Sequence, residues 1–493
     1  MGRPGRSAIL SALNIALAAR EATLARTHDL IVIGAGAAGL TAAGGCARLG
    51  LRVALVERDR MGGECLNTGC VPSKALLAAA HRAQAVRDGG RLGILAGEPT
   101  VDFGRVRAHV RAAIETIAPH DSEERFRAWG VEVIRGEARL LDGRGRVEVG
   151  GRVLEAPRIV LATGSRPAIP AVEGLAGVPF LTNETLWDLD HLPEHLVVLG
   201  GGPAGMEMAQ AFRRLGAAVT VIVSGRPFSR DDPEAAALVL ARLEAEGVTI
   251  RPGTRATRVT RTGTGLRVEI NNGWAVEGSH LLVAAGRRAA VEGLGLEAAD
   301  VAVDPGGIRV DARRRTTNPC ILAIGDCRDG PRFTHAAGHE GAVAVMSIGL
   351  GLPAALKDAA LPWVTFTDPE LAQVGLTEAD ARERHGHVEV HRESFVENDR
   401  AVAEGDTTGF VKIIKARGRV VGATIVGAGA GEMVLPWSLA IAGKASPWAI
   451  SGAVVPYPTR SELSKAVAFA AYEPRIFGPW ARRWAGVVAR LRG

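Results

Sequence analysis

Apolar residues and glycines follow the same order in two separate stretches of the chain. Residues 29–39 read DLIVIGAGAAG and residues 195–205 read HLVVLGGGPAG. In each stretch an apolar run typical of a buried strand leads into the turn G-x-G-x-x-G, and a helical pattern follows. A second apolar run comes after each helix, at residues 53–56 and 219–223. Because a strand, a glycine turn, a helix and a second strand form the βαβ unit that holds a dinucleotide, the pattern predicts two such units in an α/β fold.

The first of these units is expected to bind FAD. Its fingerprint glycines are Gly34, Gly36 and Gly39. The second strand of the unit ends at Glu57, and a carboxylate there is suited to hydrogen-bond the hydroxyls of the adenosine ribose. Two cysteines follow shortly after this strand, and a flavin is the natural partner of a redox-active pair.

The second unit is expected to bind the nicotinamide nucleotide. Its fingerprint glycines are Gly200, Gly202 and Gly205. The position that corresponds to Glu57 is Val223, so the acid that would bind the ribose hydroxyls is missing. Three polar residues nearby are able to meet a 2′-phosphate: Ser224, Arg226 and Arg230. Since guanidinium groups bind phosphate well, this substitution favours NADPH and leaves NADH as the alternative.

Two cysteines, Cys65 and Cys70, carry the chemistry with the most specific signal. They lie in the stretch GGECLNTGCVPSK at residues 62–74, and the apolar run at residues 75–80 predicts a helix that begins near Cys70. A helix N-terminus stabilises a thiolate, and Lys74 adds a positive charge one turn further on. The pair therefore indicates electron transfer through a disulfide. A structural disulfide or two buried thiols is the alternative reading of the spacing alone.

Composition and charge narrow the class of protein. The chain has 493 residues, of which 47% are hydrophobic and 23% charged, and it is long enough for two to four globular domains. The net charge of +6 is spread along the chain, so we expect no nucleic-acid partner. Five cysteines are too few for a secreted disulfide framework. We find no apolar stretch long enough to cross a membrane, and we expect a cytoplasmic protein.

The two ends of the sequence have patterns of their own. Residues 1–27 pair two arginines with an apolar run at residues 8–19, and we interpret them as an N-terminal extension, with a signal peptide as the alternative. Residues 476–493 form a basic, amphipathic tail with two tryptophans. This basic, amphipathic pattern predicts either a helix in peripheral contact with the inner membrane face or a helix packed on the dimer.

The cysteine motif and both fingerprints resemble the class I pyridine nucleotide-disulfide oxidoreductases, which include lipoamide dehydrogenase, glutathione reductase and mercuric reductase. The resemblance runs from about residue 28 to about residue 475. It implies two Rossmann-like dinucleotide-binding domains, for FAD and NAD(P), and a C-terminal α+β dimerisation domain in a homodimer. The implied boundaries are an N-terminal extension at 1–27, the FAD domain at 28–160 and 286–357, the NAD(P) domain at 161–285, the dimerisation domain at 358–475 and the tail at 476–493.

The resemblance also implies roles for individual residues. Cys65 matches the interchange thiol, which exchanges with substrate, and Cys70 matches the charge-transfer thiol, which lies against the flavin. Lys74 and Glu207 match a pair of residues that form an ion pair beside the flavin. Further cofactor-binding residues are expected at Gly63, Thr163, Gly164, Gly286 and Asp326. A helix beginning near His335 would point its N–H groups at the flavin and stabilise its reduced, anionic form. No third ligand accompanies His335 and His339, so we expect no metal site.

One stretch near the C-terminus departs from most of the family. Most of its disulfide reductases have a histidine before Pro-Thr and a glutamate five residues after that histidine, whereas residues 455–462 read VPYPTRSE. Glu462 is present, but Tyr457 replaces the histidine, and a phenol is a poor base at neutral pH. Mercuric reductases are more similar here, with Pro-Tyr-x-Thr-x-x-Glu. They also deliver mercury through a C-terminal cysteine pair, however, and the last cysteine of this chain is Cys327.

These observations lead to one main hypothesis and two alternatives. The main hypothesis is an FAD-dependent NAD(P)H oxidoreductase that passes electrons through Cys65 and Cys70 to a disulfide or metal-ion substrate. In it, Tyr457 and Glu462 act at the disulfide of the neighbouring subunit, although Tyr457 alternatively only packs the dimer interface. The first alternative is a dihydrolipoyl dehydrogenase. The second is a flavin-binding redox sensor or membrane-associated partner whose turnover is incidental.

Overall fold

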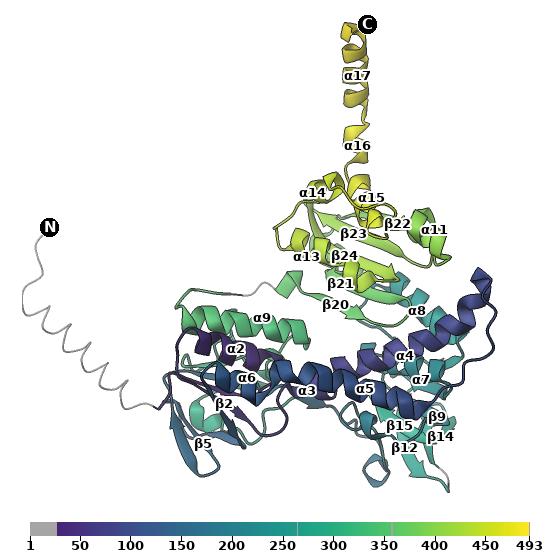
Figure 1. The fold of residues 1–493 in the computed structure, drawn as a ribbon. Coiled ribbons are helices and arrows are strands. Elements are labelled where there is room, and N and C mark those ends of the chain that lie inside the picture. The colour runs from purple at the N-terminus through teal and green to yellow at the C-terminus, as the bar shows by residue number, and fades with distance from the viewer. Residues whose placement is uncertain (1–26, 264, 356–357, 493) are drawn as a thin grey trace, which may run out of the picture. The chain divides into compact units, whose positions relative to one another are not determined.

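The computed structural model describes residues 27–263, 265–355 and 358–492, which form two compact units (Figure 1). Unit 1 contains residues 27–72, 111–166 and 287–355. Unit 2 contains the described residues of 73–110, 167–286 and 358–492. The boundary between the units falls within two helices, α4 (Cys70–Asp88) and α5 (Phe103–Ile117).

A five-stranded parallel sheet with the order β19-β7-β1-β2-β3 forms the centre of unit 1. Its strands are β1 (Leu30–Ile33), β2 (Val53–Glu57), β3 (Val131–Arg135), β7 (Ile159–Leu161) and β19 (Ile321–Ala323). Alternate residues of β1 face opposite sides, so Leu30 and Val32 join one buried cluster while Ile31 and Ile33 join another. Strands buried on both faces are uniformly apolar, which explains the apolar runs in the sequence.

Helices and short strands cover this sheet within unit 1. The first cluster includes residues of α2 (Ala37–Arg48) and α9 (Thr334–Ala344), two helices that pack against each other. The second includes residues of an antiparallel sheet of β4 (Ala138–Leu140), β5 (Arg146–Val149) and β6 (Arg152–Glu155). The remaining elements are α3 (Gly63–Asn67), α6 (Glu123–Ala128), β8 (Ser165–Pro167), β16 (Arg287–Ala289), β17 (Val303–Asp304) and β18 (Gly307–Ile308).

Unit 2 contains a second parallel sheet, of order β11-β10-β9-β15. Its strands are β9 (His195–Leu199), β10 (Ala218–Ile222), β11 (Val248–Arg251) and β15 (His280–Val283). The helices α7 (Pro203–Leu215) and α8 (Pro233–Ala245) connect β9 to β10 and β10 to β11. A small antiparallel sheet follows, formed by β12 (Ala256–Arg261), β13 (Leu266–Ile270) and β14 (Ala275–Gly278).

The C-terminal part of unit 2 is built on a five-stranded antiparallel sheet. In the order of the sheet, its strands are β20 (Pro362–Thr365), β21 (Glu370–Gly375), β24 (Arg419–Gly427), β23 (Phe410–Ala416) and β22 (Glu389–Ser394). Its helices are α10 (Glu378–His385), α11 (Asp399–Glu404), α12 (Ala430–Met433), α13 (Leu435–Ile441), α14 (Pro447–Gly452), α15 (Glu462–Ala470), α16 (Glu473–Ile476) and α17 (Pro479–Arg492). Two parallel sheets with glycine turns and a C-terminal antiparallel sheet confirm the predicted fold class. Among the described residues, no helix is long and apolar enough to cross a membrane.

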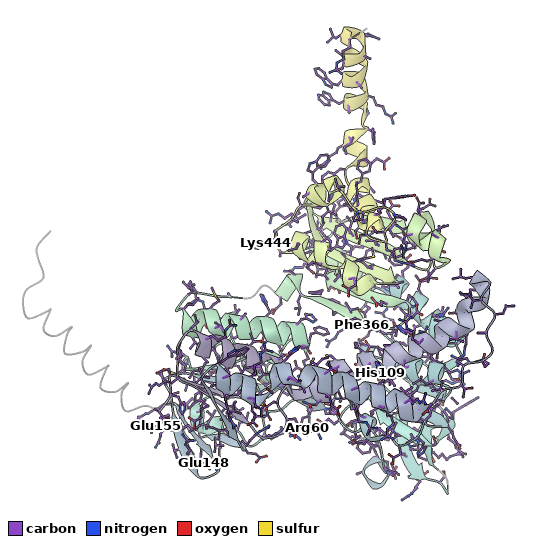
Figure 2. All side chains as sticks on the ribbon, in the orientation of Figure 1. Arg60, His109, Glu148, Glu155, Phe366 and Lys444 are labelled. Atoms are coloured by element: carbon purple, nitrogen blue, oxygen red, sulfur yellow. The ribbon has the colours of Figure 1, made fainter. Side chains whose placement is uncertain are left out.

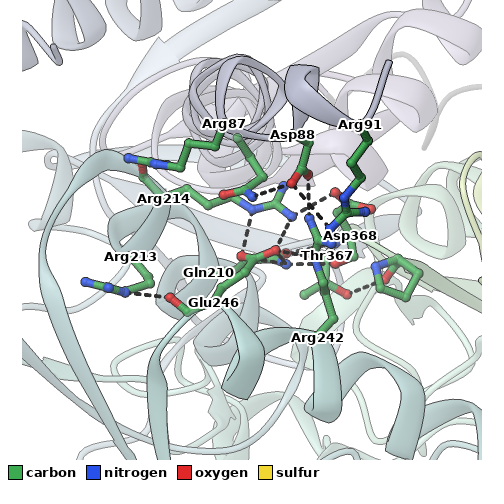
Figure 3. Close-up of polar contacts among 12 residues, drawn as sticks. Arg87, Asp88, Arg91, Gln210, Arg213, Arg214, Arg242, Glu246, Thr367 and Asp368 are labelled. Atoms are coloured by element: carbon green, nitrogen blue, oxygen red, sulfur yellow. Dashed lines mark hydrogen bonds and ion pairs between the residues drawn. The ribbon is translucent and has the colours of Figure 1, made fainter. Parts of the chain in front are cut away.

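A buried network of charged side chains ties several elements of unit 2 together (Figure 3). Arg214 of α7, whose side chain is 1% exposed, donates to both carboxylate oxygens of Glu246 at 2.8 and 2.6 Å and to Asp368 at 2.7 Å. Arg242 of α8 donates to Asp88 of α4 at 2.9 Å and also pairs with Glu246. The network therefore joins α4, α7, the end of α8 and the loop between β20 and β21.

Replacing Arg214 with methionine should destabilise the protein by about 3–5 kcal/mol, because it leaves the Glu246 carboxylate buried with fewer partners. The matched control is Arg267→Met, which breaks an exposed pair with Glu277 and should cost less than about 1 kcal/mol. Urea unfolding of the purified variants measures both. Equal unfolding midpoints for the two variants would contradict a supporting role for the network.

Candidate functional site

The turn between β1 and α2 in unit 1 shows why its three glycines are needed. Gly34 has φ of +105°, and a Cβ on it would overlap the carbonyl group of Ala162. A Cβ on Gly39 would overlap the carbonyl of Gly34, so the third glycine permits close packing of α2 against the turn. A Cβ on Gly36 would instead meet open space, since the nearest neighbouring atom, the Cα of Gly63, would lie 4.0 Å from it. An open backbone at a helix N-terminus fits a pyrophosphate, which N–H groups bind there.

The turn between β9 and α7 in unit 2 repeats this arrangement. Gly200 has φ of +132°, and a Cβ on it would overlap the carbonyl of Ala284. A Cβ on Gly205 would overlap the carbonyl of Gly200, whereas nothing lies within 4 Å of a Cβ on Gly202. The two turns therefore divide the roles of their glycines in the same way, and both fit a dinucleotide.

Glu57 lies at the end of β2, next to the first glycine turn. Its Oε2 accepts a hydrogen bond from the backbone N–H of Ala35 at 2.6 Å, and its Oε1 accepts one from Asp59 at 2.8 Å. These bonds fix the carboxylate at the carboxyl end of the sheet. Each oxygen keeps a lone pair for a further donor, so the residue fits a ribose hydroxyl.

In unit 2 the loop after β10 brings together the three residues expected at a 2′-phosphate. Ser224, Arg226 and Arg230 are all exposed, whereas Val223 before them is buried. Arg226 donates to the carbonyl oxygens of Ser229 and Asp231 at 2.9 and 3.3 Å, which holds its guanidinium on this loop. The loop therefore presents positive charge where the matching loop of unit 1 presents Glu57.

The cysteine pair lies in unit 1, where α3 ends and α4 begins. Cys65 is in α3 and half-buried, and Cys70 is the first residue of α4 and exposed. Both are thiols in this structure, and the Sγ of Cys70 lies 3.2 Å from the hydroxyl oxygen of Thr334, the first residue of α9. The pKa of Cys65 is raised well above its usual range, first by its hydrogen bond with Cys70 and then by burial. The two sulfurs therefore interact directly, as a redox pair requires.

The other three cysteines have different surroundings. Cys46 and Cys327 are fully buried, and burial raises the pKa of each thiol to about 11. Cys320 is half-buried. A protonated, buried thiol is unreactive, so Cys46 and Cys327 are unsuited to exchange. Cys65 and Cys70 are therefore the candidate redox pair.

A chain of polar contacts in unit 1 connects the cysteine motif to the predicted cofactor residue Asp326. Glu64, which precedes Cys65, is paired with Arg287. The Nε of Arg287 donates to the hydroxyl of Ser165 at 2.8 Å, and that hydroxyl donates to Asp326 at 2.8 Å. Burial raises the pKa of Glu64, although the charge of Arg287 opposes this shift. The contacts hold Asp326 and the cysteine motif within one polar cluster.

Two more predicted cofactor residues lie in the same unit. The hydroxyl of Thr163 donates to the carbonyl of Ala290 at 2.7 Å, and Gly164 has φ of +73° with nothing within 4 Å of an added Cβ. A second buried carboxylate, Glu340 of α9, accepts from the backbone N–H of Gly325 at 2.7 Å and pairs with Arg328. These contacts fix the turn that carries Asp326. The helix expected near His335 is confirmed, since α9 begins at Thr334.

The expected ion pair between Lys74 and Glu207 is present in unit 2. The Nζ of Lys74 lies 2.7 Å from the Oε2 of Glu207, whose side chain is only 5% exposed. The Oε1 of Glu207 accepts from the backbone N–H of Phe366 at 2.9 Å, and the ammonium lies 4.5 Å from the centre of the Phe366 ring. Phe366, labelled in Figure 2, follows directly after β20. Two contacts thus fix the lysine, a third fixes its carboxylate partner, and the carboxylate compensates the charge of the lysine.

Tyr457 and Glu462 also lie in unit 2, near the start of α15. The phenol of Tyr457 is 71% exposed and donates to the carboxylate of Asp399 at 2.8 Å. This hydrogen bond is the main reason why the pKa of Tyr457 is raised above its usual value. Glu462, the first residue of α15, accepts from the backbone N–H of Thr459 at 3.3 Å. A phenol held in this way is a hydrogen-bond donor rather than a base at neutral pH.

The residues of these clusters that were not predicted from the sequence include Thr334, Arg287, Phe366 and Asp399. Thr334 directly precedes His335, and Arg287 directly follows Gly286. Because His335 and Gly286 were singled out, the motifs around them pointed to these two positions. Phe366 and Asp399 had no such signal, because each meets its partner through a contact between residues far apart in the chain. The predicted Gly286 has φ of +128° and accepts a backbone hydrogen bond from Ala168 in unit 2.

Comparison with known proteins finds two family models that together span most of the chain. Residues 28–341 match the model described as pyridine nucleotide-disulphide oxidoreductase. Residues 361–468 match the model described as the dimerisation domain of the same oxidoreductases. Both regions of the fold built above therefore have counterparts in one group of proteins.

Individual relatives are similar along almost their whole length. A mercuric reductase of Streptomyces lividans is 37% identical over 454 residues, which is 90% of this chain and 95% of the relative. A dihydrolipoyl dehydrogenase of Thermus scotoductus is 37% identical over 453 residues, 89% of this chain and 96% of the relative. Among solved structures, LpdA from Mycobacterium tuberculosis has a TM-score of 0.83 at 29% identity, covering 90% of this chain and 99% of that one. The HOCl-induced flavoprotein disulfide reductase RclA from Escherichia coli has a TM-score of 0.80 at 26% identity, with the same coverage.

The raised pKa of Tyr457 gives a direct titration test. The chain has only two tyrosines, so ultraviolet absorbance of tyrosinate should resolve both, and Tyr457→Phe should remove the step that belongs to Tyr457. That step should lie above the ordinary phenol value, and Asp399→Asn should move it down, because the carboxylate that disfavours the phenolate is gone. Glu462→Gln serves as the control and should move it less. An unchanged titration in Asp399→Asn would refute the hydrogen bond as the cause.

Proposed function

Because the chain belongs to the pyridine nucleotide-disulphide oxidoreductase family, we propose that it passes electrons from NADPH through FAD and a Cys65–Cys70 disulfide to a disulfide or metal-ion substrate. It is a flavin-dependent enzyme, and FAD and a pyridine nucleotide are the cofactors typical of this family. The observation that carries the proposal is the placement of Cys65 in α3 and of Cys70 at the first residue of α4, in the unit that contains the first glycine turn.

The redox step of the proposal takes place at the two sulfurs. When bound at the first glycine turn and Glu57, FAD would supply the two-electron chemistry between the nicotinamide and the disulfide. Breaking the disulfide consumes two electrons, and the resulting pair holds a proton on Cys65, whose pKa is raised by Cys70 and by burial. The hydroxyl of Thr334, 3.2 Å from the Sγ of Cys70, is placed so that it would donate to that sulfur when it is a thiolate. In reducing a substrate disulfide, the sulfur of Cys65 attacks one substrate sulfur, and its proton goes to the substrate thiol that leaves. The Cys70 thiolate then attacks Cys65 in the mixed disulfide, which releases the second substrate thiolate and restores the Cys65–Cys70 disulfide.

NADPH is proposed as the electron donor because of the loop after β10. The exposed guanidinium groups of Arg226 and Arg230 supply positive charge there, and Val223 offers no acceptor for ribose hydroxyls. Ser224 adds a hydroxyl to the same loop. NADH is the alternative donor. The proposed NADPH supply favours a cytoplasmic location.

For the substrate, we propose a metal ion or a disulfide in preference to dihydrolipoamide. The relatives include both mercuric reductases and dihydrolipoyl dehydrogenases. The choice between their substrates is therefore argued from the residues of the site. Oxidation of a dithiol needs a base, and Tyr457 is held as a hydrogen-bond donor by Asp399. Dihydrolipoyl dehydrogenase activity, with Glu462 and water in place of the base, is the second candidate. A flavin-binding redox sensor is the third.

The dimerisation domain supports a homodimer. We propose that Tyr457 and Glu462 act at the disulfide of the partner subunit in that dimer. Several large apolar side chains of the C-terminal part of unit 2 are exposed in the single chain, which is typical of an interface. They are Leu435, Leu439, Trp448, Val454 and Phe469.

The first test is spectroscopic. Anaerobic two-electron reduction of the yellow holoenzyme should produce a long-wavelength absorbance band from a thiolate next to the flavin. Cys70→Ser should abolish the band, whereas Cys65→Ser should leave a free thiolate that shows it. Cys320→Ser is the matched control and should behave as wild type, because Cys320 lies outside the motif.

Thiol titration completes this test, since reduction should add two reactive thiols. If the wild type shows neither the band nor a reducible disulfide, the proposed electron path fails. The reduced enzyme should then be offered glutathione disulfide, lipoamide and Hg(II) in turn. Fast reoxidation by lipoamide alone would favour the dihydrolipoyl dehydrogenase alternative.

The second test concerns the nucleotide. Arg226→Gln and Arg230→Gln should each raise the KM for NADPH about ten-fold or more, since a phosphate–arginine contact contributes roughly 1.5–3 kcal/mol. The KM for NADH should stay unchanged, because NADH has no 2′-phosphate. Arg267→Gln, on β13, is the matched control. A wild-type kcat/KM that is higher with NADH than with NADPH would overturn the assignment.

A further inference from the structure

The last helix of the chain, α17, is unlike the other long helices of unit 2. It is the last labelled helix of the ribbon in Figure 1, has 14 residues and follows Gly478. None of its side chains is buried. Its large apolar residues are largely open to solvent: Trp480 is 75% exposed, Trp484 57% and Leu491 80%. Several large apolar side chains exposed on one helix indicate an interaction surface, because the surfaces of soluble monomeric proteins seldom present such residues together.

These apolar residues form a single stripe. Trp480, Trp484, Val487 and Leu491 follow one another at intervals of four, three and four residues, which places them on one face of an α-helix. The two tryptophan rings stack, with centroids 6.2 Å apart and planes 2° from parallel. The stripe therefore offers a continuous apolar edge with two aromatic rings near its beginning.

The remainder of α17 is positively charged. Its charged residues are Arg482, Arg483, Arg490 and Arg492, and residues 474–493 contain no acidic side chain. Within the part of the chain that the structure describes, none of these four arginines is paired with a carboxylate, whereas Arg214 and Arg328 each have one. The spacing puts Arg482 opposite the stripe and Arg483, Arg490 and Arg492 along its two flanks. The charges and the apolar stripe together make an amphipathic basic helix.

We propose that α17 lies on the surface of an anionic phospholipid bilayer. The apolar stripe would enter the boundary between head groups and acyl chains, where tryptophan is favoured, and the arginines would meet the lipid phosphates. A helix of this length is too short to cross the hydrocarbon region, so the contact is peripheral. Charge complementarity favours lipid over a second copy of α17, since two such stripes packed together would bring only arginines near each other.

The proposal is tested with full-length holoenzyme and sedimentable vesicles. The protein should bind vesicles that contain phosphatidylglycerol in phosphatidylcholine, should not bind phosphatidylcholine alone, and should be released by salt. Arg482→Gln with Arg483→Gln should lower the partition coefficient about five-fold for each charge. Trp480→Ala with Trp484→Ala should lower it about ten-fold or more.

Trp274→Ala is the matched control, because Trp274 is also exposed, at 64%, but lies between β13 and β14. It should bind as wild type. Flavin absorbance and NADPH oxidation in solution should be the same in all variants, since α17 holds none of the proposed catalytic residues. Absence of binding to anionic vesicles, or equal binding of the tryptophan double variant, would overturn the proposal. A smaller mass of that variant by light scattering would instead identify a second copy as the occupant.

Discussion

Glu246 is the residue on which the arrangement of unit 2 depends most. Its carboxylate is 7% exposed, so its charge has lost most of its hydration, and only well-placed cations offset that cost. Arg214 and Arg242 provide them, and the same two guanidinium groups reach Asp368 and Asp88. Each arginine thus compensates the buried charge of Glu246 and also holds a second element, which is the β20–β21 loop for Arg214 and α4 for Arg242. Since α4 carries Lys74 and α7 carries Glu207, the network also sets the separation of the ion pair in the candidate site.

Unit 1 uses the same arrangement around Glu340. This carboxylate is almost fully buried between Arg314 and Arg328, and it accepts the N–H of Gly325. A buried charge of this kind contributes little net stability compared with an apolar core, but it permits few alternative geometries. In both units the charged cluster lies beside a turn or a pair that belongs to the candidate site. Positional accuracy, rather than stability, is therefore what these clusters supply.

The sequence predicts the parts of the site that depend on local structure. The glycine turns, the start of α4 at Cys70 and the strand that ends at Glu57 each follow from a few consecutive residues, because steric limits on the backbone act locally. The ion pair of Lys74 and Glu207 was accessible only through family resemblance. The contacts of Arg214 with Asp368, and of Tyr457 with Asp399, were not predicted. They join residues that are distant in the chain, and no periodicity or spacing marks one acidic residue among the 53 of the sequence as the partner.

Three ionisable groups around the proposed chemistry have pKa values shifted in the same direction. The hydrogen bond with Cys70 raises the pKa of Cys65, and burial raises the pKa of Glu64. The hydrogen bond to Asp399 raises the pKa of Tyr457. Each shift lets the group keep its proton to a higher pH than usual, and makes the ionised form a stronger proton acceptor. Reduction of a substrate disulfide consumes protons, and oxidation of a dithiol releases them to a base. The raised pKa values therefore agree with the proposed reduction of a substrate disulfide, because that reaction takes up protons.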